Sequence, residues 1–183
     1  MLRPDLVEKK LDIQAEICER NFRFLADNGF HIIFGGDDFA SNDAPVYSPG
    51  VFHRFMLPAL QRVAKACHAC GSYFCFASDG NLWPVADDLF GISGVDAYYE
   101  IDRRAGMDLK SLRERFPNLT LLGNISSTDV ATLTPEEVVA QTRECFDFAS
   151  STRGVIAGVS NYFVPGTPIE NIRAVLDTIR LYR

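Results

Sequence analysis

Apolar residues recur at spacings of three and four along residues 5–28. They are Val7, Leu11, Ala15, Cys18, Phe22 and Leu25. This spacing predicts an amphipathic helix with one buried stripe. The Asn28-Gly29 pair predicts its end, because both residues tolerate the left-handed conformation that closes a helix.

Short apolar runs follow, each separated from the next by a helical pattern. Strands are predicted at 31–35, 73–77, 95–99, 119–123 and 154–159, and helices at 51–70, 82–89, 108–116, from 134 onward and from 167 to about 181. Ser48 and Pro49 suit the start of the 51–70 helix, and Pro58 predicts a break near Leu57. Threonine, proline and glutamate recur at 134–137 and 167–170, the signature of a capping box.

This order, one helix followed by five strand–helix units, predicts an α/β fold with a parallel sheet covered by helices. The strands are apolar throughout, which is typical of strands buried on both faces. No linker or low-complexity segment divides residues 1–183, so we expect a single domain.

Composition and charge narrow the function classes. The chain has 183 residues, a net charge of −6 and 47% hydrophobic residues, which fits a globular protein with a real core. The acidic balance argues against a nucleic-acid partner. No apolar run is long enough to span a membrane, and the charged first residues do not resemble a secretory signal. The five cysteines are scattered, which is typical of free thiols, so we expect a cytoplasmic protein.

Polar side chains follow every predicted strand. They are Asp37 and Asp38, Asp79, Glu100 and Asp102, Asn124, and Asn161. The carboxyl ends of parallel strands meet at one edge of a sheet, where α/β folds build their sites. The alternative is that these residues only cap the following helices. Asp38 and Asn161 weigh against it, because each lies several residues before its helix.

Other motifs are weaker. Cys67 and Cys70 form a lone CxxC pair, and a structural zinc site would need a second pair. His31 lies within a predicted strand and is expected to be a core residue. No glycine-rich phosphate loop and no nucleophile elbow is present.

The segments GGDDFA, YSPGVFHRFMLPAL, FASDGN, GVDAYYEID, LLGNI, LTPEEV and GTPIENIRAV resemble, in order and spacing, the uroporphyrinogen decarboxylase superfamily. This superfamily also contains cobamide-dependent methyltransferases. The resemblance implies an eight-stranded β/α barrel of the TIM type, which takes about 250 residues. The five strands predicted here would be the carboxy-terminal part of such a barrel, an incomplete barrel.

The aspartate pair and the Ser-Pro that follow the first strand resemble the methyltransferase branch. The resemblance implies methyl transfer between a corrinoid and a small acceptor. The implied catalytic residues are Asp38, Asp79 and Glu100, and the implied substrate-binding residues are Asp37, Ser48, Tyr99, Asn124 and Asn161. Tetrapyrrole decarboxylation is an alternative. A binding or assembly module without catalysis is a third interpretation.

The resemblance also bears on cofactors. Zinc-dependent methyltransferases of this superfamily carry a His-x-Cys motif after the strand that corresponds to 73–77, and a third ligand near the last strand. These positions fall on Ala77, Asp79 and Asn161. Alanine has no donor atom and an amide is a poor zinc ligand. We therefore expect no tightly bound metal or cofactor, and a corrinoid or tetrapyrrole as ligand.

Five strands cannot close an eight-stranded barrel, so one apolar face and two sheet edges would remain open. Ile33, Cys75, Ala97 and Leu121 are expected on that inner face. Leaving it in water is unfavourable, so the sequence predicts a homo-oligomer that covers it. The helix at 5–28 is the alternative cover.

Overall fold

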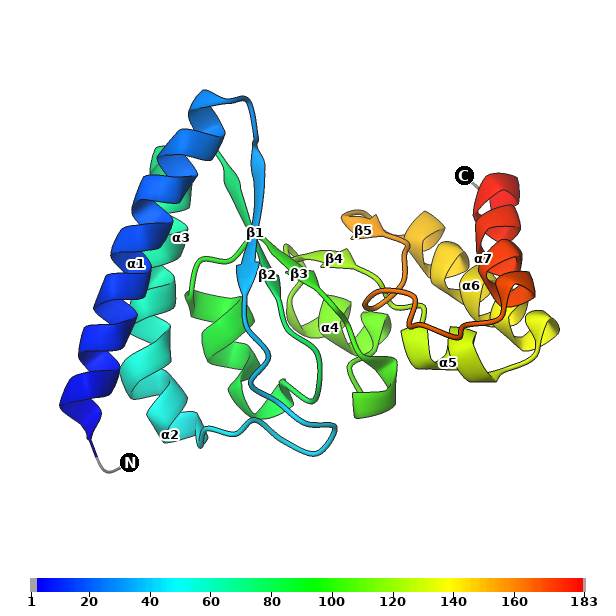
Figure 1. The fold of residues 1–183 in the computed structure, drawn as a ribbon, viewed down its shortest axis with the longest axis horizontal. Coiled ribbons are helices and arrows are strands. Elements are labelled where there is room, and N and C mark those ends of the chain that lie inside the picture. Colours follow the sequence, from blue (N-terminus) through cyan, green and yellow to red (C-terminus); the bar gives the residue numbers. More distant parts are fainter. Residues whose placement is uncertain (1–2, 183) are drawn as a thin grey trace.

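A computed structural model describes residues 3–182. Figure 1 shows a sheet with helices on one side and at both ends. The first element is the long helix α1 (Pro4–Asp27). It begins with proline at its first turn, where the missing N–H is not needed.

Five parallel strands form one sheet in the order β1-β2-β3-β4-β5. Their bounds are β1 (Ile32–Gly36), β2 (Tyr73–Ala77), β3 (Ala97–Tyr99), β4 (Thr120–Leu122) and β5 (Val155–Ile156). The sheet is open and has β1 and β5 at its edges. The predicted parallel α/β architecture is confirmed. The last strand is shorter than expected, with a further bridge between Ile125 and Val159.

The predicted break near Leu57 is confirmed. The segment divides into α2 (Pro49–Val51), a π-helical turn η1 (Phe52–Met56) and α3 (Leu57–Ala69). The N–H of Leu57 donates to the carbonyl oxygen of Phe52, five residues earlier. Because Pro58 has no N–H to donate, the helix widens before it and resumes the α form after it.

The helical segment expected at 82–89 is confirmed, but its helix type and its end differ from the prediction. A 3-10 turn, η2 (Trp83–Val85), leads into a π-helical segment, η3 (Asp87–Ile92). Pro84 and Gly91 disfavour a regular α-helix at its two ends. The hydroxyl of Ser93 donates to the carbonyl of Leu89 inside the segment.

The remaining helices are η4 (Arg103–Ala105), α4 (Leu109–Arg115), α5 (Ser127–Thr132), α6 (Pro135–Ser151) and α7 (Ile169–Tyr182). The capping box of Thr134 and Glu137 at α6 is confirmed. The corresponding box at 167–170 is wrong, because the Thr167 hydroxyl donates to the Val164 carbonyl instead. The short helix α5 was not predicted.

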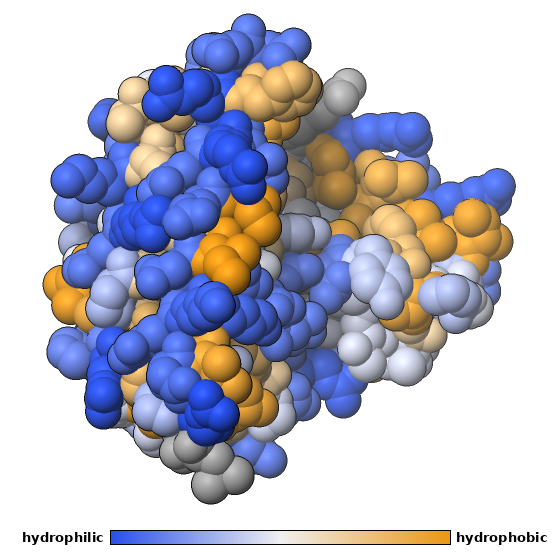
Figure 2. Space-filling view, turned by 60° about the vertical axis from the view of Figure 1, so that its left-hand side comes forward, coloured by the Kyte–Doolittle hydropathy of each residue, from blue (hydrophilic) through white to orange (hydrophobic). Residues whose placement is uncertain are grey.

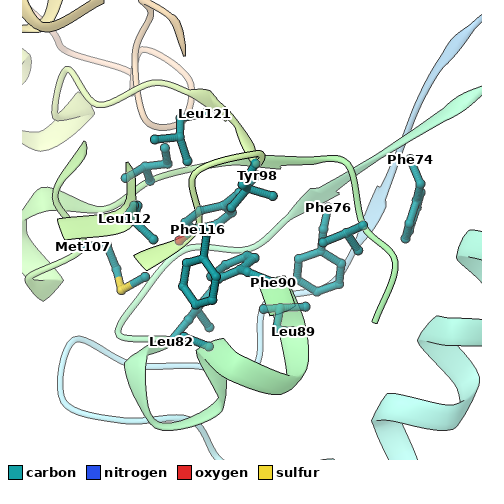
Figure 3. Close-up of a cluster of buried hydrophobic side chains, with 14 of the residues drawn as sticks. Phe74, Phe76, Leu82, Leu89, Phe90, Tyr98, Met107, Leu112, Phe116 and Leu121 are labelled. Atoms are coloured by element: carbon teal, nitrogen blue, oxygen red, sulfur yellow. The ribbon is translucent and has the colours of Figure 1, made fainter. Parts of the chain in front are cut away.

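One face of the sheet, here called the outer face, packs on the helices. Ile33, Phe74, Phe76, Tyr98 and Leu121 point to this side and belong to the main core. Figure 3 shows Phe76 and Tyr98 pointing toward Leu89 and Phe90 of η3, and the rings of Phe90 and Tyr98 lie 4.6 Å apart.

The opposite face, here called the inner face, carries the alternate residues of each strand. Phe34, Cys75 and Ala97 are neighbours there through the register of the ladder. Ile32, Phe34, Tyr73 and Ile156 on this face are more than half exposed. The expectation that both faces of every strand are buried is therefore wrong. Ile33 and Leu121 were expected here but lie on the outer face, because side chains alternate along a strand.

Helix α1 does not cover the inner face. It packs against α3, and Phe22 of α1 contacts Phe74 on the outer face with ring centroids 5.8 Å apart. Figure 1 shows α1 and α3 side by side in the same layer. The alternative cover for the inner face is thus excluded.

Candidate active-site rim

The first three strands end at the same level. The ladder pairs Gly36 with Ala77, and Ala77 with Tyr99, as the last residues of their strands. The residues that follow begin side by side at the carboxyl edge of the sheet. We call this edge, with the loops after β1, β2 and β3, the rim.

Hydrogen bonds join the loop after β1 to the loop after β2. The N–H of Asp79 donates to Oδ1 of Asp38 at 3.4 Å. The N–H of Asn81 donates to the carbonyl of Ser41 at 2.8 Å, and its side-chain Nδ2 donates to the carbonyl of Asp43 at 2.9 Å. These hydrogen bonds fix the two loops, and with them Asp38 and Asp79, relative to each other.

Two glycines permit this close approach. A Cβ on Gly36 would lie 2.0 Å from the carbonyl oxygen of Ala77, and one on Gly80 would lie 2.7 Å from that of Ala40. Both residues also have positive φ angles, +150° and +79°, which L side chains rarely adopt. The sequence places glycine where the loops touch.

Two of the three predicted catalytic carboxyls, Asp79 and Glu100, have raised pKa values. Burial, followed by the charges of Asp38 and Asp102, raises the pKa of Asp79. Burial, followed by the charges of Asp38 and Asp79, raises the pKa of Glu100 to about 7. The structure thus brings Asp38, Asp79 and Glu100 together at the rim, and near neutral pH the cluster can hold or release a proton.

Glu100 stands at a strained backbone position. Its φ of 69° makes it the one non-glycine residue with positive φ in the part of the chain that the structure describes. The left-handed conformation costs a residue with a Cβ about 1 kcal/mol or more. The turn directly after β3 therefore holds a carboxyl where glycine would be favoured.

Aromatic rings lie on the inner face just below the rim. Phe34 and Tyr99 meet edge to face, with ring centroids 5.8 Å apart. Cys75 lies on the strand between theirs and is fully buried, and burial raises the pKa of its thiol to about 12. Tyr99, predicted to bind substrate, is half-buried. The rim thus combines carboxyls with an aromatic floor.

The other predicted binding residues have structural partners. Nδ2 of Asn124 donates to the carbonyls of Ile101 and Met107, and the side chain is 7% exposed. Asn161 donates its N–H to the Ser127 hydroxyl, and its own Oδ1 accepts from the N–H of Tyr162.

Ser48 accepts from the N–H of Val51 and caps α2. Asp37 is exposed beside Asp38. Neither residue is tied to the rim carboxyls by a hydrogen bond that the structure shows within residues 3–182.

Sequence reasoning did not single out two residues that shape this site. Asn81 joins the two loops, and Phe34 forms the aromatic floor. Asp102, which the sequence analysis placed among the polar residues after the third strand, raises the pKa of Asp79. Asn81 follows Gly80 directly, and a polar residue after a turn glycine is the available signal. No sequence signal pointed to Phe34, because an apolar residue is expected at a strand position on either face of the sheet.

The donor set for zinc is poor. Ala77, Asp79 and Asn161 occupy the positions that the resemblance assigns to metal ligands, and they do not fit a thiolate or imidazole site. Within residues 3–182, no three side chains of histidine, cysteine, aspartate or glutamate form a group that could hold a metal ion.

The CxxC segment lies near the amino ends of the strands, opposite the rim. Nε2 of His68 pairs with Oδ2 of Asp96 at 2.8 Å, and the same oxygen accepts from the N–H of Phe74 at 2.7 Å. Cys67 is fully buried, and burial raises the pKa of its thiol to about 11. His31, expected in the core, is exposed just before β1. These residues lie apart from the rim.

Among the described residues, no helix is both long enough and apolar enough to cross a membrane.

Comparison with known proteins agrees with the fold. The family model described as uroporphyrinogen decarboxylase (URO-D) matches residues 1–182. A methylated-thiol–coenzyme M methyltransferase from Methanosarcina mazei is 28% identical over 183 residues, which cover 93% of this chain and 43% of that protein.

Two further relatives represent both branches. A methylcobamide:CoM methyltransferase from Methanosarcina barkeri is 28% identical over 95% of this chain and 48% of its own length. A uroporphyrinogen decarboxylase from Anaeromyxobacter sp. is 30% identical over 70% of this chain and 35% of its own length. The chain spans less than half the length of these relatives. Its five parallel strands are consistent with part of a TIM barrel, and it belongs to the uroporphyrinogen decarboxylase family.

Proposed function

We propose that this chain forms the acidic rim of a site for methyl transfer between a corrinoid and a small acceptor, of the kind implied by the methyltransferase branch. The observation that carries the proposal is the convergence of Asp38, Asp79 and Glu100 at the ends of three adjacent strands. The corrinoid is the substrate that delivers the methyl group. Two relatives bear names of coenzyme M methyltransferases.

The rim supplies a base for this reaction. An acceptor such as a thiol must lose its proton, with an ordinary pKa near 8.5. The pKa of Glu100, about 7, is closer to that value than the pKa of an ordinary carboxyl, and a matched pKa favours general-base catalysis. The thiolate attacks the methyl carbon, the cobalt–carbon bond breaks, and its electron pair remains on the corrinoid.

Decarboxylation of a tetrapyrrole is the second candidate. It requires protonation of a pyrrole carbon as carbon dioxide leaves. The raised pKa of Glu100 favours this candidate too, because a carboxyl with a pKa of about 7 is partly protonated near neutral pH and can donate. The aromatic pair Phe34 and Tyr99 would offer a planar ring system a surface to stack on.

Two assays on the same preparation decide among the candidates. In the first, the protein is mixed with methylcobalamin and a small thiol, and the loss of the methyl–cobalt absorbance and the methylated thiol are measured. In the second, it receives uroporphyrinogen under reducing conditions, and the decarboxylated products are separated. Turnover in the first assay supports methyl transfer, and turnover in the second alone replaces it with decarboxylation.

Matched variants test whether Glu100 is responsible for turnover. Glu100→Gln is expected to lower turnover at least tenfold. Glu114→Gln, on the exposed surface of α4, should leave it unchanged. Binding of either ligand without turnover would contradict both enzymatic candidates and favour a module that binds but does not catalyse.

The remaining properties belong to the same proposal. The ligand is a small molecule of the corrinoid or tetrapyrrole class, and neither nucleic acid nor membrane takes part. The protein works in the cytoplasm as a homo-oligomer. The net charge of −6 supports the exclusion of nucleic acid.

A further inference from the structure

Glu100 occupies a backbone conformation that its own chemistry disfavours. Its φ is 69°, and it stands directly after β3, between Tyr99 and Ile101. A residue with a Cβ stays in the left-handed region only when its surroundings fix the backbone. Tyr99, before it, is held by the ladder to Ala77 of β2. The backbone after Glu100 therefore needs a fixed point of its own, at Ile101.

Asn124 supplies this fixed point from the end of the next strand. Its Nδ2 donates to the carbonyl of Ile101 at 3.3 Å and to the carbonyl of Met107 at 3.1 Å. Because carbonyl oxygens only accept hydrogen bonds, both contacts use the amide nitrogen, and its two hydrogens are then committed. A single side chain thus closes the turn from Ile101 to Met107 at both ends.

Both ends of this turn are also anchored in the core. The side chains of Ile101 and Met107 are fully buried, and Figure 3 shows Met107 among the core side chains near Leu112. Inside the turn, the N–H of Met107 donates to the carbonyl of Asp102 at 3.1 Å. A turn closed in this way leaves little freedom to Glu100, which leads directly into it.

The side chain of Asn124 is buried, whereas polar side chains cover much of the surface seen in Figure 2. Asn124 is 7% exposed, so water cannot readily replace the partners of its Nδ2. Loss of the amide would leave the carbonyls of Ile101 and Met107 without this donor, and a buried carbonyl without a donor is unfavourable. The contact therefore favours the closed turn over an open one.

The backbone next to Asn124 is itself fixed. The N–H of Gly123 donates to the carbonyl of Ile156 at 3.0 Å, which ties it to β5. A Cβ on Gly123 would lie 3.7 Å from the backbone nitrogen of Ile101, so this glycine packs beside the peptide that joins Glu100 to Ile101. The end of β4 therefore contacts the strained turn through its backbone as well as through Asn124.

We propose that Asn124 is a positioning residue that holds the Ile101–Met107 turn closed and thereby keeps Glu100 in its left-handed conformation at the rim. This role differs from direct substrate binding, because Nδ2 of Asn124 has no hydrogen left for a ligand. The effect of Asn124 on turnover rests on the proposed function, in which Glu100 is the base. Its effect on the position of Glu100 does not, and that effect is measured without a substrate.

The ionisation of Glu100 reports its position. Burial, followed by the charges of Asp38 and Asp79, raises its pKa to about 7. All three influences weaken when a carboxyl moves out into water. Release of the turn should therefore lower the pKa of Glu100 toward its ordinary value of 4.5.

Carbon-13 NMR of the glutamate carboxyls, with Glu100→Gln to identify the signal, measures this pKa. Asn124→Ala is expected to lower it by about one pH unit or more. Asn171→Ala is the matched control, because Asn171 is also buried and its Nδ2 also donates to two carbonyls, those of Val130 and Leu133. The control should leave the pKa of Glu100 near 7. An unchanged pKa in Asn124→Ala, or an equal fall in Asn171→Ala, overturns the proposal.

A second measurement needs no substitution at Asn124 and covers the case in which Asn124→Ala does not fold. In the wild-type protein, the side-chain amide signals of Asn124 should shift as Glu100 ionises, with a midpoint near pH 7. This shift should vanish in Glu100→Gln, and the amide signals of Asn171 should not shift in either protein. Amide signals of Asn124 that do not respond to the ionisation of Glu100 also overturn the proposal.

Turnover separates this proposal from the proposed function. Where the wild-type protein turns over a substrate, Asn124→Ala should lower the pH at which the rate is half-maximal, because the pKa of the base falls. Asn171→Ala should leave that pH unchanged. If the NMR results are as expected but no protein shows turnover, the positioning role of Asn124 stands and the proposed function fails.

Discussion

One oxygen of Asp38 accepts the backbone N–H of Asp79, and the charge of the same Asp38 raises the pKa of the Asp79 carboxyl. The carboxylate thus fixes the position of its neighbour and at the same time disfavours its ionisation. Burial of Asp79 acts in the same direction and is the larger cause.

Asp79→Asn should abolish ligand binding or turnover and leave the fold intact. The amide keeps the size of the side chain, and the backbone N–H still reaches Asp38, but the exchangeable proton is lost. Ligand titration and circular dichroism measure the two effects. Asp147→Asn, on the exposed surface of α6, is the control. An unfolded Asp79→Asn protein would mean that the carboxylate serves the turn and not the ligand.

Glu100→Gln should stabilise the protein above neutral pH. The folded-state pKa of about 7 exceeds the ordinary value of 4.5, so the unfolded chain releases this proton first as the pH rises. Stability from Glu100 is therefore complete below about pH 4.5 and is lost as the pH rises to about 7. After allowance for solvent screening, the gain at pH 8 is on the order of 1 kcal/mol. Urea unfolding of both proteins at pH 5 and pH 8 measures it, and an equal difference at both values would contradict the assignment.

Asn81→Ala should loosen the rim. The substitution removes the bond from Nδ2 to the Asp43 carbonyl and the bond that Oδ1 accepts from the N–H of Trp83. The expected loss of unfolding free energy is about 1–2 kcal/mol, with weaker ligand binding. Asn118→Ala, in the exposed turn before β4, should cost little. Equal effects of the two substitutions would show that the loops do not depend on Asn81.

Gly36→Ala should be severely destabilising, by more than about 3 kcal/mol. The new Cβ would lie 2.0 Å from the carbonyl oxygen of Ala77, which belongs to the backbone and cannot move aside. Gly50→Ala is the comparison, because a Cβ there meets nothing within 4 Å. Thermal unfolding of both proteins gives the difference, and a tolerated Gly36→Ala would mean that β1 and β2 can separate at the rim.

Purified protein should contain much less than one zinc ion per chain. Ala77 offers no donor and Asn161 only an amide, so two of the three positions implied by the resemblance cannot bind zinc tightly. Metal analysis after dialysis, with the dialysis buffer as the blank, measures the content. Stoichiometric zinc that survives dialysis would show that other residues provide the ligands.

Local chemistry explains which parts of this fold are readable from the sequence. Pro58 removes an N–H and Thr134 supplies a cap, so the break in the second helix and the start of α6 follow from single residues. The carboxyls after the strands were predictable because the ends of parallel strands must meet. The exposure of Phe34 was not predictable, since phenylalanine occurs both on covered and on open faces of a sheet. The π-helical form of η3 also has no distinct sequence pattern.

Cys75 gives the protein a chemical reporter. The thiol is fully buried on the strand between those that carry Phe34 and Tyr99, and with a pKa of about 12 it is almost wholly protonated near neutral pH. A thiol-reactive dye can reach it only when the structure around it opens locally. The rate at which Cys75 is labelled, followed by peptide mass spectrometry, therefore measures how often this part of the sheet opens and how far a bound ligand reduces that opening.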